Sequence, residues 1–415
     1  MKRIAVVGGG VSGLVAAYRL GVHHQVVLYE REAEPGGHTH TVVVERPEGV
    51  WHVDTGFIVY NDRTYPEFIV LLDELGITGQ AAPMGFSVRC GDSGLEYSGS
   101  GLNGFFADRR NLVSWRHWRM LGEILRFNRA APALLETDQG DLPLGEYLER
   151  EGYSDAFRRY YILAMGGAIW SCGEARIADF PAGFFVRFFA HHGLLQLRDR
   201  PRWRVLPGGS MTYVSALRAR MRADLRTSTP VHSVRRVASG VELVTAAGTE
   251  HYDEVVLACH SDEALGLLTD ARPRERDLLA ATEWEDNEVV LHTDTSLLPR
   301  RYRAWSSWNA MLEEGREERT RLTYNMNILQ GLDAPVTFCV SLNSTDRIDP
   351  GKVLGRYHFS HPLFTAASVA AREALLRQNG EDRVWFCGAW CGNGFHEDGV
   401  VSAQRVARAL LEQDG

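Results

Sequence analysis

Lysine is almost missing from this chain. Only Lys2 and Lys352 are lysines, so arginine supplies 43 of the 45 basic residues. Any chemistry that needs a lysine amine therefore has only these two candidates. The chain also lacks an uninterrupted apolar stretch of about 18 residues, so we expect no helix that spans a bilayer.

Cysteines are few and scattered. The six are Cys90, Cys172, Cys259, Cys339, Cys387 and Cys391. Because no secretory features accompany them, we expect reduced thiols in a cytoplasmic protein. The C-x3-C pair near the C-terminus has no second pair or histidine cluster beside it, so we predict no metal site. The basic start of the chain leads into three glycines, which indicates folded structure and not a signal peptide.

Composition bounds the class of protein. With 415 residues, 45% apolar and 24% charged, the chain is long enough for two domains around substantial cores. Its net charge of -8 provides no general positive field that would gather phosphates. We therefore expect no nucleic-acid partner.

The start of the chain has the pattern of a dinucleotide-binding turn. An apolar strand over residues 3–7 runs into a glycine-rich turn and then into a helix. Gly8 allows the tight turn, Gly10 allows a pyrophosphate to approach the backbone, and Gly13 allows the helix to pack on the strand. The N-terminus of the helix then faces the phosphates.

An acid stands where a ribose-binding carboxylate is expected. A second strand over residues 25–29 ends at Glu30, about 20 residues after the glycines. A carboxylate at this spacing accepts hydrogen bonds from the ribose hydroxyls. The predicted contacts of the dinucleotide in this region are Gly8, Gly10, Val11, Ser12, Gly13, Glu30 and Arg31.

A second glycine pair, Gly36-Gly37, follows this acid and indicates which dinucleotide binds. A pair in this position resembles the flavin amine oxidase, phytoene desaturase and protoporphyrinogen oxidase superfamily, which implies FAD as the cofactor. In that superfamily the pair lets the chain pass close to the pyrophosphate and usually precedes an arginine or lysine. Here His38 replaces the cation. We expect backbone N–H groups, with or without an imidazolium at His38, to meet the phosphate charge.

Four marker strings extend the resemblance over nearly the whole chain. They are G-H-T-H-T from Gly37, D-T-G-F-I-V-Y-N from Asp54, Y-S-G-S from Tyr97 and G-F-H-E-D-G from Gly394. They are similar to a bacterial set of NAD/FAD-binding proteins with an amine-oxidase-like fold. Such proteins are often encoded beside enzymes resembling cyclopropane fatty acid synthases, and some are implicated in furan fatty acid synthesis. Further FAD contacts that the resemblance implies are Thr39, Thr55, Gly56, Val231, Gly388, Gly399 and Val400.

The expected fold class is α/β. It combines a Rossmann-like FAD-binding domain, of the amine oxidase and glutathione reductase type, with an inserted α+β substrate domain. The ranges expected for the FAD-binding domain are 1–60, 201–285 and 375–415. Those for the substrate domain are 61–200 and 286–374.

Local signals predict several individual elements. Residues 65–75 have a helical period that stops at Gly76. Residues 84–97 resemble a pair of strands around a Gly-containing turn. After a Pro-Gly-Gly turn we expect a helix over residues 213–225, followed by a strand over residues 230–234.

Residues 100–200 are aromatic-rich and mostly helical in pattern. Segments 160–170 and 180–189 are apolar on nearly every side, which indicates burial or the lining of an apolar cavity. An aromatic stripe is more often plain core, but two of them favour room for an apolar ligand. The candidate pocket residues are Trp170, Trp305, Trp308, Tyr324, Asn325 and Phe395, and each fits a core or sheet-face position equally well.

The stretch Arg109–Arg129 contains six arginines among Trp115 and Trp118, with Glu123 as its only acid. This pattern is typical of a helix on an anionic bilayer surface. The alternative is a solvated helix whose apolar side packs on its own domain. We predict a lipid partner and a peripheral location on the inner face of the cytoplasmic membrane.

The predicted reaction is dehydrogenation of an unsaturated or methyl-branched fatty acyl chain, with phospholipid as one carrier, by hydride transfer to flavin N5. An acyl chain has no acidic C–H group, so hydride must leave before a weak base removes the neighbouring proton. His396 and Glu397 are the candidate bases, because the resemblance places their loop beside the flavin. The alternative is that both cap the C-terminal helix.

Two other functions fit the sequence. Amine oxidases of this superfamily commonly use a lysine that holds a water against the flavin, and Lys2 at the start of a strand does not suit that role. A flavin amine or amino-acid oxidase is therefore the second hypothesis, and a flavin-holding partner of another lipid-modifying enzyme is the third. A lipid substrate predicts a long apolar tunnel, whereas a charged substrate predicts a buried arginine or acid facing the ring.

Overall fold

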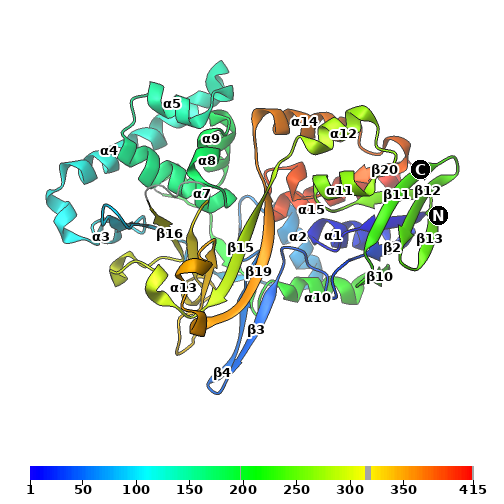
Figure 1. The fold of residues 1–415 in the computed structure, drawn as a ribbon, viewed down its shortest axis with the longest axis horizontal. Helices are drawn as coiled ribbons and strands as arrows, with labels where there is room; N and C mark the ends of the chain where they lie inside the picture. Colours follow the sequence, from blue (N-terminus) through cyan, green and yellow to red (C-terminus); the bar gives the residue numbers. More distant parts are fainter. Residues whose placement is uncertain (197, 314–318, 414–415) are drawn as a thin grey trace.

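Apolar strands that are buried on both faces form a parallel sheet near the two chain termini (Figure 1). The computed structural model describes residues 1–196, 198–313 and 319–413. The sheet has five strands in the order β10-β2-β1-β14-β20. They are β1 Arg3–Val7, β2 Gln25–Tyr29, β10 Asp224–Arg226, β14 Glu254–Leu257 and β20 Val384–Phe386.

Helices cover one face of this sheet, and a second small sheet lies on the other. The first face packs on α1 Val11–Leu20, α2 Pro66–Leu75, α10 Met211–Arg220 and α15 His396–Glu412. The second face packs on the antiparallel strands β11 Val231–Val237, β12 Gly240–Thr245 and β13 Gly248–Tyr252, and on α11 Ser261–Leu267, α12 Pro273–Ala280 and α14 Ala366–Arg377. This layered arrangement confirms the predicted Rossmann-like fold class.

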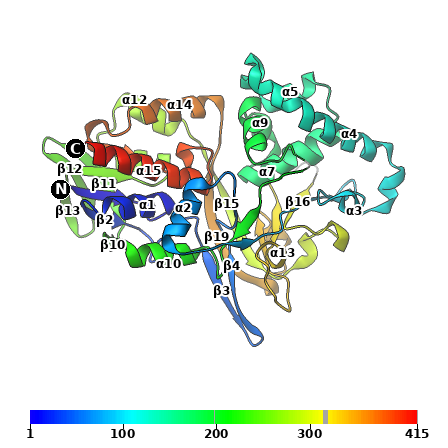
Figure 2. The ribbon, with the colours of Figure 1, turned by 180° about the vertical axis from the view of Figure 1, so that it is seen from behind.

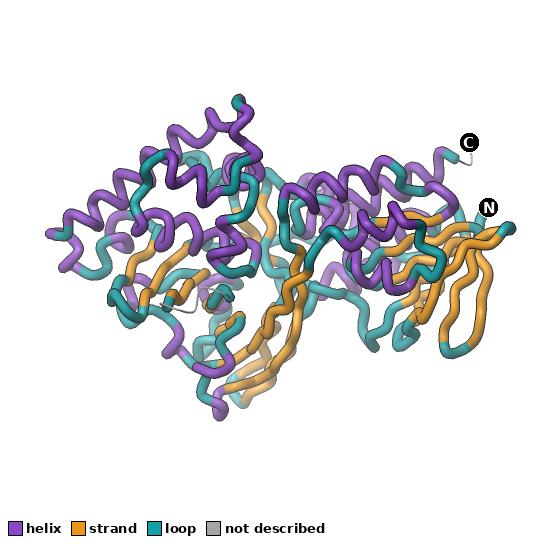
Figure 3. Tube along the Cα trace, turned by 45° about the horizontal axis from the view of Figure 1, so that its top comes forward, coloured by secondary structure: helices purple, strands orange, loops and turns teal. Residues whose placement is uncertain are grey.

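A seven-stranded sheet occupies the middle of the molecule, in the order β19-β15-β18-β17-β16-β7-β8. Its strands are β7 Phe86–Cys90, β8 Glu96–Ser98, β15 Trp284–His292, β16 Trp308–Leu312, β17 Leu322–Asn325, β18 Cys339–Leu342 and β19 Val353–Pro362. The short helix α13 Met326–Leu329 follows β17. In Figure 3 the strands form two groups, one beside the chain termini and one near the middle.

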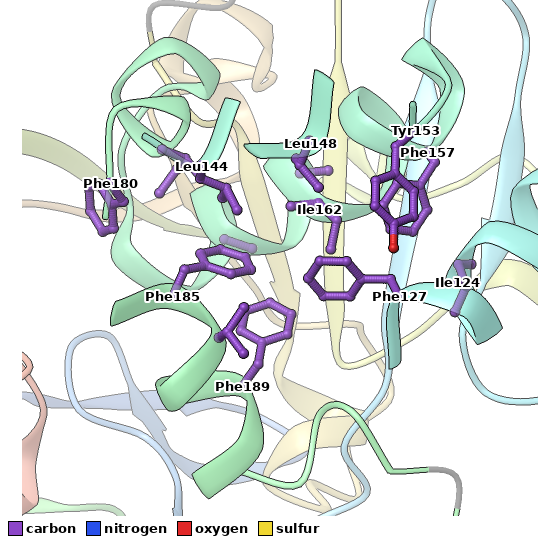
Figure 4. Close-up of a cluster of buried hydrophobic side chains, with 14 of the residues drawn as sticks. Ile124, Phe127, Leu144, Leu148, Tyr153, Phe157, Ile162, Phe180, Phe185 and Phe189 are labelled. Carbon is purple, nitrogen blue, oxygen red and sulfur yellow. The ribbon is translucent and has the colours of Figure 1, made fainter. Parts of the chain in front are cut away.

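Helices gather at the end of the molecule away from the termini (Figure 1). They are α3 Leu102–Phe105, α4 Trp115–Ala130, α5 Leu144–Arg150, α6 Asp155–Phe157, the π-helix η4 Arg158–Leu163, α7 Ala164–Trp170, α8 Glu174–Ala178 and α9 Ala182–His191. Figure 4 shows Phe127, Phe157, Phe185 and Phe189 converging from α4, α6 and α9. These rings build the core that joins the helices.

Short elements complete the fold. The hairpin β3 Thr41–Arg46 and β4 Gly49–Asp54 projects from one side of the molecule (Figure 2), and β5 Tyr60–Asn61, β9 Trp203–Val205 and β6 Gln80–Ala81 form a small sheet. The 3-10 helices are η1 Arg109–Val113, η2 Ala131–Glu136, η3 Asp138–Asp141, η5 Thr295–Leu297, η6 Tyr302–Ala304, η7 Thr345–Arg347, η8 Pro350–Lys352, η9 Glu381–Arg383 and η10 Ala389–Cys391. None of the helices in the described ranges is long and apolar enough to cross a membrane.

The local predictions were partly right. Helix α2 ends at Gly76, which has φ 73°, as its period predicts. The helix predicted over residues 213–225 was wrong at its C-terminal end, because α10 stops at Arg220 and β10 begins at Asp224. Pairing of β10 with the edge of β2 overrides the helical pattern there, and Arg226 is fixed by the carboxylate of Glu250. The boundaries of the two domains stay a prediction.

Candidate functional site

The glycine turn between β1 and α1 leaves an open cradle at the start of the helix. Gly8 has φ 106°, a conformation that favours glycine. A Cβ atom at Gly13 would lie 1.8 Å from the carbonyl oxygen of Gly8, so the helix packs directly on the turn. A Cβ atom at Gly10 would meet no heavy atom within 4 Å. The space beside Gly10 is therefore free for a ligand at the positive end of α1.

Glu30 lies against this turn at the end of β2. One carboxylate oxygen accepts a hydrogen bond from the Gly9 N–H at 2.6 Å, and the other accepts one from the Glu32 N–H at 2.8 Å. Each oxygen has a second lone pair, so the carboxylate can still accept from ribose hydroxyls. Arg31 points elsewhere: its side chain is exposed and pairs with Glu263 at 2.7 Å.

The second glycine pair packs on the first. The Gly36 N–H donates to the Gly9 carbonyl oxygen at 2.8 Å, and a Cβ atom at Gly37 would lie 3.1 Å from Gly10 Cα. Gly37 has φ 58°, which favours a residue without a side chain. The structure thus brings the glycine turn after β1 and the Gly36-Gly37 pair together. The residues around the Gly10 cradle fit a dinucleotide pyrophosphate.

His38 is held in a group of imidazoles. Its ring centroid is 5.3 Å from that of His361 and 5.9 Å from that of His260, and its Nε2 lies 3.1 Å from the carbonyl oxygen of Ser360. Burial, followed by these two histidines, holds the pKa of His38 well below its ordinary value. The hypothesis of an imidazolium at His38 thus loses support, and the helix N-terminus is the better source of positive potential.

The loop that follows is tied to α10 and α15 by a buried chain of hydrogen bonds. The hydroxyl oxygens of Thr39 and Tyr213 are 2.7 Å apart, and the Tyr213 hydroxyl lies 2.9 Å from His396 Nε2. Tyr213 carries no motif signal and was missed by the sequence analysis. Thr55 contacts His40 Nδ1 at 2.6 Å. A Cβ atom at Gly56 would lie 2.0 Å from the His38 carbonyl oxygen, so the loop can pass there only as glycine.

Asp54 begins one of the marker strings, but the sequence analysis assigned no role to it. Its carboxylate is fully buried and accepts hydrogen bonds from the Thr41 hydroxyl at 2.6 Å, the Ser210 N–H at 2.8 Å and Gln330 Nε2 at 2.9 Å. Burial raises the pKa of Asp54 to about 7. This carboxylate joins the β3–β4 hairpin, the Pro-Gly-Gly turn and the end of α13. A buried acid at the end of a strand was the available signal.

The first turn of α15 meets the first turn of α1. A Cβ atom at Gly399 would lie 2.7 Å from Val11 Cγ1 and 3.0 Å from Ser12 Oγ, so the absence of a side chain permits this approach. Val400 is fully buried, and the Gly388 N–H donates to Ser402 Oγ at 3.0 Å. Two helix N-termini are therefore close together, which strengthens the positive potential. Val231 is half-buried at the start of β11.

His396 and Glu397, the predicted bases, are engaged in contacts inside the protein. The His396 ring stacks on Phe57 with centroids 3.6 Å apart, and burial lowers its pKa to about 3. The two carboxylate oxygens of Glu397 accept hydrogen bonds from the N–H groups of Glu67 and Phe68, both at 2.9 Å. Glu397 thus caps the N-terminus of α2, and both residues have structural roles that argue against action as a base.

The predicted pocket residues divide into two groups. Trp170 and Phe395 are neighbours, with ring centroids 6.4 Å apart, and Trp308 and Tyr324 pack edge to face at 5.1 Å. All four belong to the apolar cluster of the helical region or pack against it. The other two residues have separate roles. Trp305 donates from Nε1 to the Pro299 carbonyl oxygen at 2.7 Å, and Asn325 caps α13 by accepting from the Ile328 N–H.

The aromatic cluster reaches the start of α15. Phe395 is the N-cap residue of that helix, and its ring stacks on Phe188 with centroids 4.7 Å apart. The indole N–H of Trp170 is buried and has no hydrogen-bond partner among the described residues. Burial lowers the pKa of His192, which stacks on Phe188, to about 4, so this ring is neutral. The wall beside α15 is apolar and aromatic.

A glycine turn at a helix N-terminus, an adjacent acid and a second glycine pair together define a dinucleotide-binding oxidoreductase site. Comparison with known families agrees. The chain belongs to the flavin-containing amine oxidoreductases, whose family model matches residues 11–284. The predictions of an enzyme and of FAD as its cofactor are confirmed. No curated protein matched the chain.

Solved structures share this fold at low sequence identity. The putative protoporphyrinogen oxidase from Exiguobacterium sp. 255-15 is 18% identical, with a TM-score of 0.69 and coverage of 99% of both chains. Cyclohexylamine oxidase from Brevibacterium oxydans IH-35A is 16% identical, with a TM-score of 0.72 and the same coverage. The CLA-producing fatty acid isomerase from P. acnes is 15% identical, with a TM-score of 0.70 and 98% coverage of both chains.

Proposed function

We propose that this flavin-dependent oxidoreductase dehydrogenates an unsaturated or methyl-branched fatty acyl chain. The observation that carries the proposal is the aromatic wall beside α15. The ring contacts of Trp170 are all with phenylalanines: Phe180, Phe184, Phe185, Phe188 and Phe395. Such a wall suits an alkyl chain, because burying apolar surface is favourable without any specific polar partner.

The two lysines support the same choice. Lys2 pairs with Glu254 at 3.2 Å at the start of β1, whereas the glycine turn lies at the other end of that strand. Lys352 pairs with Asp294 at 3.4 Å, just before β19 begins. Lys2 is thus at the far end of β1 from the cradle at Gly10 and Lys352 is held by Asp294, so a lysine-held water beside the cofactor is not part of the proposal.

Each part of the site has a distinct task in this proposal. When bound, FAD supplies a hydride acceptor. The turns around Gly10 and Gly37 bind the pyrophosphate, and Glu30 accepts from the ribose. Phe395, at the partly exposed edge of this cluster, would contact the chain, and the buried rings behind it, including Trp170, would exclude water from the reacting carbon. Loss of a hydride to the cofactor and of the neighbouring proton to a base would leave one additional double bond in the chain.

An amine oxidase activity is the second candidate. Aromatic faces attract cations, so the rings of Trp170 and Phe395 are also compatible with an alkylammonium group. The fold of the chain is shared with cyclohexylamine oxidase, and equally with a fatty acid isomerase, so it does not discriminate between the two.

Anaerobic mixing separates these functions. Flavin absorbance near 450 nm is followed after addition of phospholipids with unsaturated or methyl-branched chains, of free fatty acids, or of alkyl amines, with saturated straight-chain lipid as the control. We expect bleaching by the unsaturated or branched chains and none by the control. Bleaching by amines alone would refute the proposal in favour of an oxidase. Bleaching by no compound would favour a flavin-holding partner of another enzyme.

A further inference from the structure

Large apolar side chains are exposed on η1, α4 and η6, and α4 lies at the end of the molecule farthest from the termini (Figure 1). Val113 is 91% exposed, Tyr302 77% and Trp115 65%. Val113 ends η1 and Trp115 begins α4, whereas Tyr302 begins η6, so these side chains come from two separate parts of the chain. Helix η6 packs on α3, which brings both parts together. We call this group the apolar tip; its members are Leu102, Leu112, Val113, Trp115, Trp118 and Tyr302.

The core does not use these side chains. Helix α4 already buries Met120, Ile124 and Phe127, which share one helical face. Trp118 lies over Phe106 and donates from Nε1 to the Leu112 carbonyl oxygen, which fixes η1 against α4. The apolar tip is thus held in place by internal contacts while its outer surface faces solvent.

Arginines surround the apolar tip. Arg116, Arg300 and Arg303 are exposed and have no ion pair within the described ranges. Glu123, the only acid of α4, is turned inward, where it accepts from the N–H and hydroxyl of Ser154. Glu123 also pairs with Arg119 at 3.2 Å, so Arg116 is the arginine of α4 beside the apolar tip whose charge no acid among the described residues compensates.

A cavity of about 340 Å³ lies beside the apolar tip and is lined by Arg89, Arg110, Arg300 and Arg301, together with Glu96. Asp108 pairs with two of these arginines, Arg110 at 2.8 Å and Arg301 at 2.9 Å. Four guanidinium groups thus face two carboxylates, which leaves the cavity positive. Phosphate oxygens suit such a site, because guanidinium groups bind them in bidentate fashion.

We propose that the apolar tip inserts into the surface of an anionic lipid bilayer, with the surrounding arginines binding headgroup phosphates. Tryptophan and tyrosine beside arginine are the residue types that partition into this interface. A second copy of the chain is a poorer occupant, since a two-fold contact would bring two copies of the same arginine-rich surface together. This proposal narrows the membrane-binding segment that the sequence analysis predicts, Arg109–Arg129, to the apolar tip and the arginines beside it.

Vesicle sedimentation tests the charge requirement. The flavin-loaded protein is mixed at low salt with vesicles of phosphatidylglycerol and phosphatidylcholine, or of phosphatidylcholine alone. We expect binding to the anionic vesicles, at least tenfold weaker in the double variant Arg116→Gln, Arg303→Gln. The matched control, Arg274→Gln, Arg276→Gln, changes the charge equally on exposed arginines of α12 and should bind as wild type does.

A second pair of variants tests insertion. The double variant Val113→Ser, Trp115→Ser should also weaken binding at least tenfold, whereas Val50→Ser, at an exposed valine on β4, should not. Unchanged flavin content and unfolding temperature would show that every variant folds, since all substituted side chains are exposed. The assay needs no turnover, so its outcome is independent of the proposed reaction.

Three results would overturn the docking proposal. Wild-type protein that ignores anionic vesicles even at low salt, where screening is weakest, would show that no docking occurs. Equal losses in the tip and control variants would show nonspecific attraction only. Unchanged vesicle binding, together with a change in oligomeric state in the tip variants, would assign the apolar tip to a protein partner.

Discussion

Replacement of Gly10 by alanine should separate cofactor binding from folding. Gly10 has φ -70° and ψ -179°, a conformation open to any residue, and its Cβ position is surrounded by empty space. Alanine there should leave the apoprotein intact or stabilise it by about 0.4–1 kcal/mol, because it restricts the unfolded chain. The added methyl group would occupy the cradle. We expect FAD to bind at least tenfold more weakly, a loss of about 1.4 kcal/mol.

Gly13→Ala is the matched comparison. Its Cβ would lie 1.8 Å from the Gly8 carbonyl oxygen, so the backbone must shift, at a cost of about 1–3 kcal/mol. Urea unfolding of the apoproteins measures stability, and fluorescence titration with FAD measures affinity. We expect the Gly10→Ala apoprotein to be as stable as wild type but to bind FAD weakly. We expect the Gly13→Ala apoprotein to be less stable than wild type. A destabilised Gly10→Ala protein with wild-type FAD affinity would refute the cradle.

Further outcomes follow from the buried side chains of Glu397, Tyr213 and Cys391. Glu397→Gln should lower the free energy of unfolding by about 1 kcal/mol, because the cap on α2 is weakened. The rate of flavin reduction should not change. A hundredfold slower rate would instead show that Glu397 acts as a base. Burial raises the pKa of Glu397 from an ordinary 4.5 to about 7. Between pH 4.5 and 7 the native state therefore binds more protons than the unfolded state, and the free energy of unfolding falls as pH rises. The Gln variant should lack this contribution to the pH dependence of stability in urea titrations. Tyr213→Phe should cost about 1–3 kcal/mol, because Thr39 and His396 lose their shared partner, and no measurable loss in urea unfolding would contradict that role. Burial raises the pKa of Cys391 to about 12, so we expect a protonated, unreactive thiol and non-covalent flavin. Acid precipitation should then release all the flavin, and yellow colour left in the pellet would show covalent attachment.

The cofactor side of the site could be predicted from sequence because its signals are local. A strand, a glycine turn and a helix occupy consecutive residues, and Glu30 follows at a fixed distance. Gly13 is informative for the same reason, since the residue that its side chain would meet, Gly8, lies in the same short segment. Fold class followed from the order of these elements.

The substrate side was harder to predict because its contacts join distant segments. Asp54 acquires its role from Ser210 and Gln330, which are far away in the chain. Trp305 and Asn325 looked like pocket residues by type, but a carbonyl oxygen and a helix end fix their side chains elsewhere. Residue type alone does not say which partner a buried polar group finds.

The first turn of α15 shows why proximity to a cofactor does not imply chemistry. A helix that approaches a ligand with its N-terminus presents backbone N–H groups, so the positions closest to the ligand need small side chains. Gly399 meets that need by packing on Val11 and Ser12. Successive residues of a helix point about 100° apart, which leaves His396 and Glu397 to face α10 and α2, where both have structural partners. The proposed function therefore assigns substrate recognition to the aromatic wall that begins at Phe395.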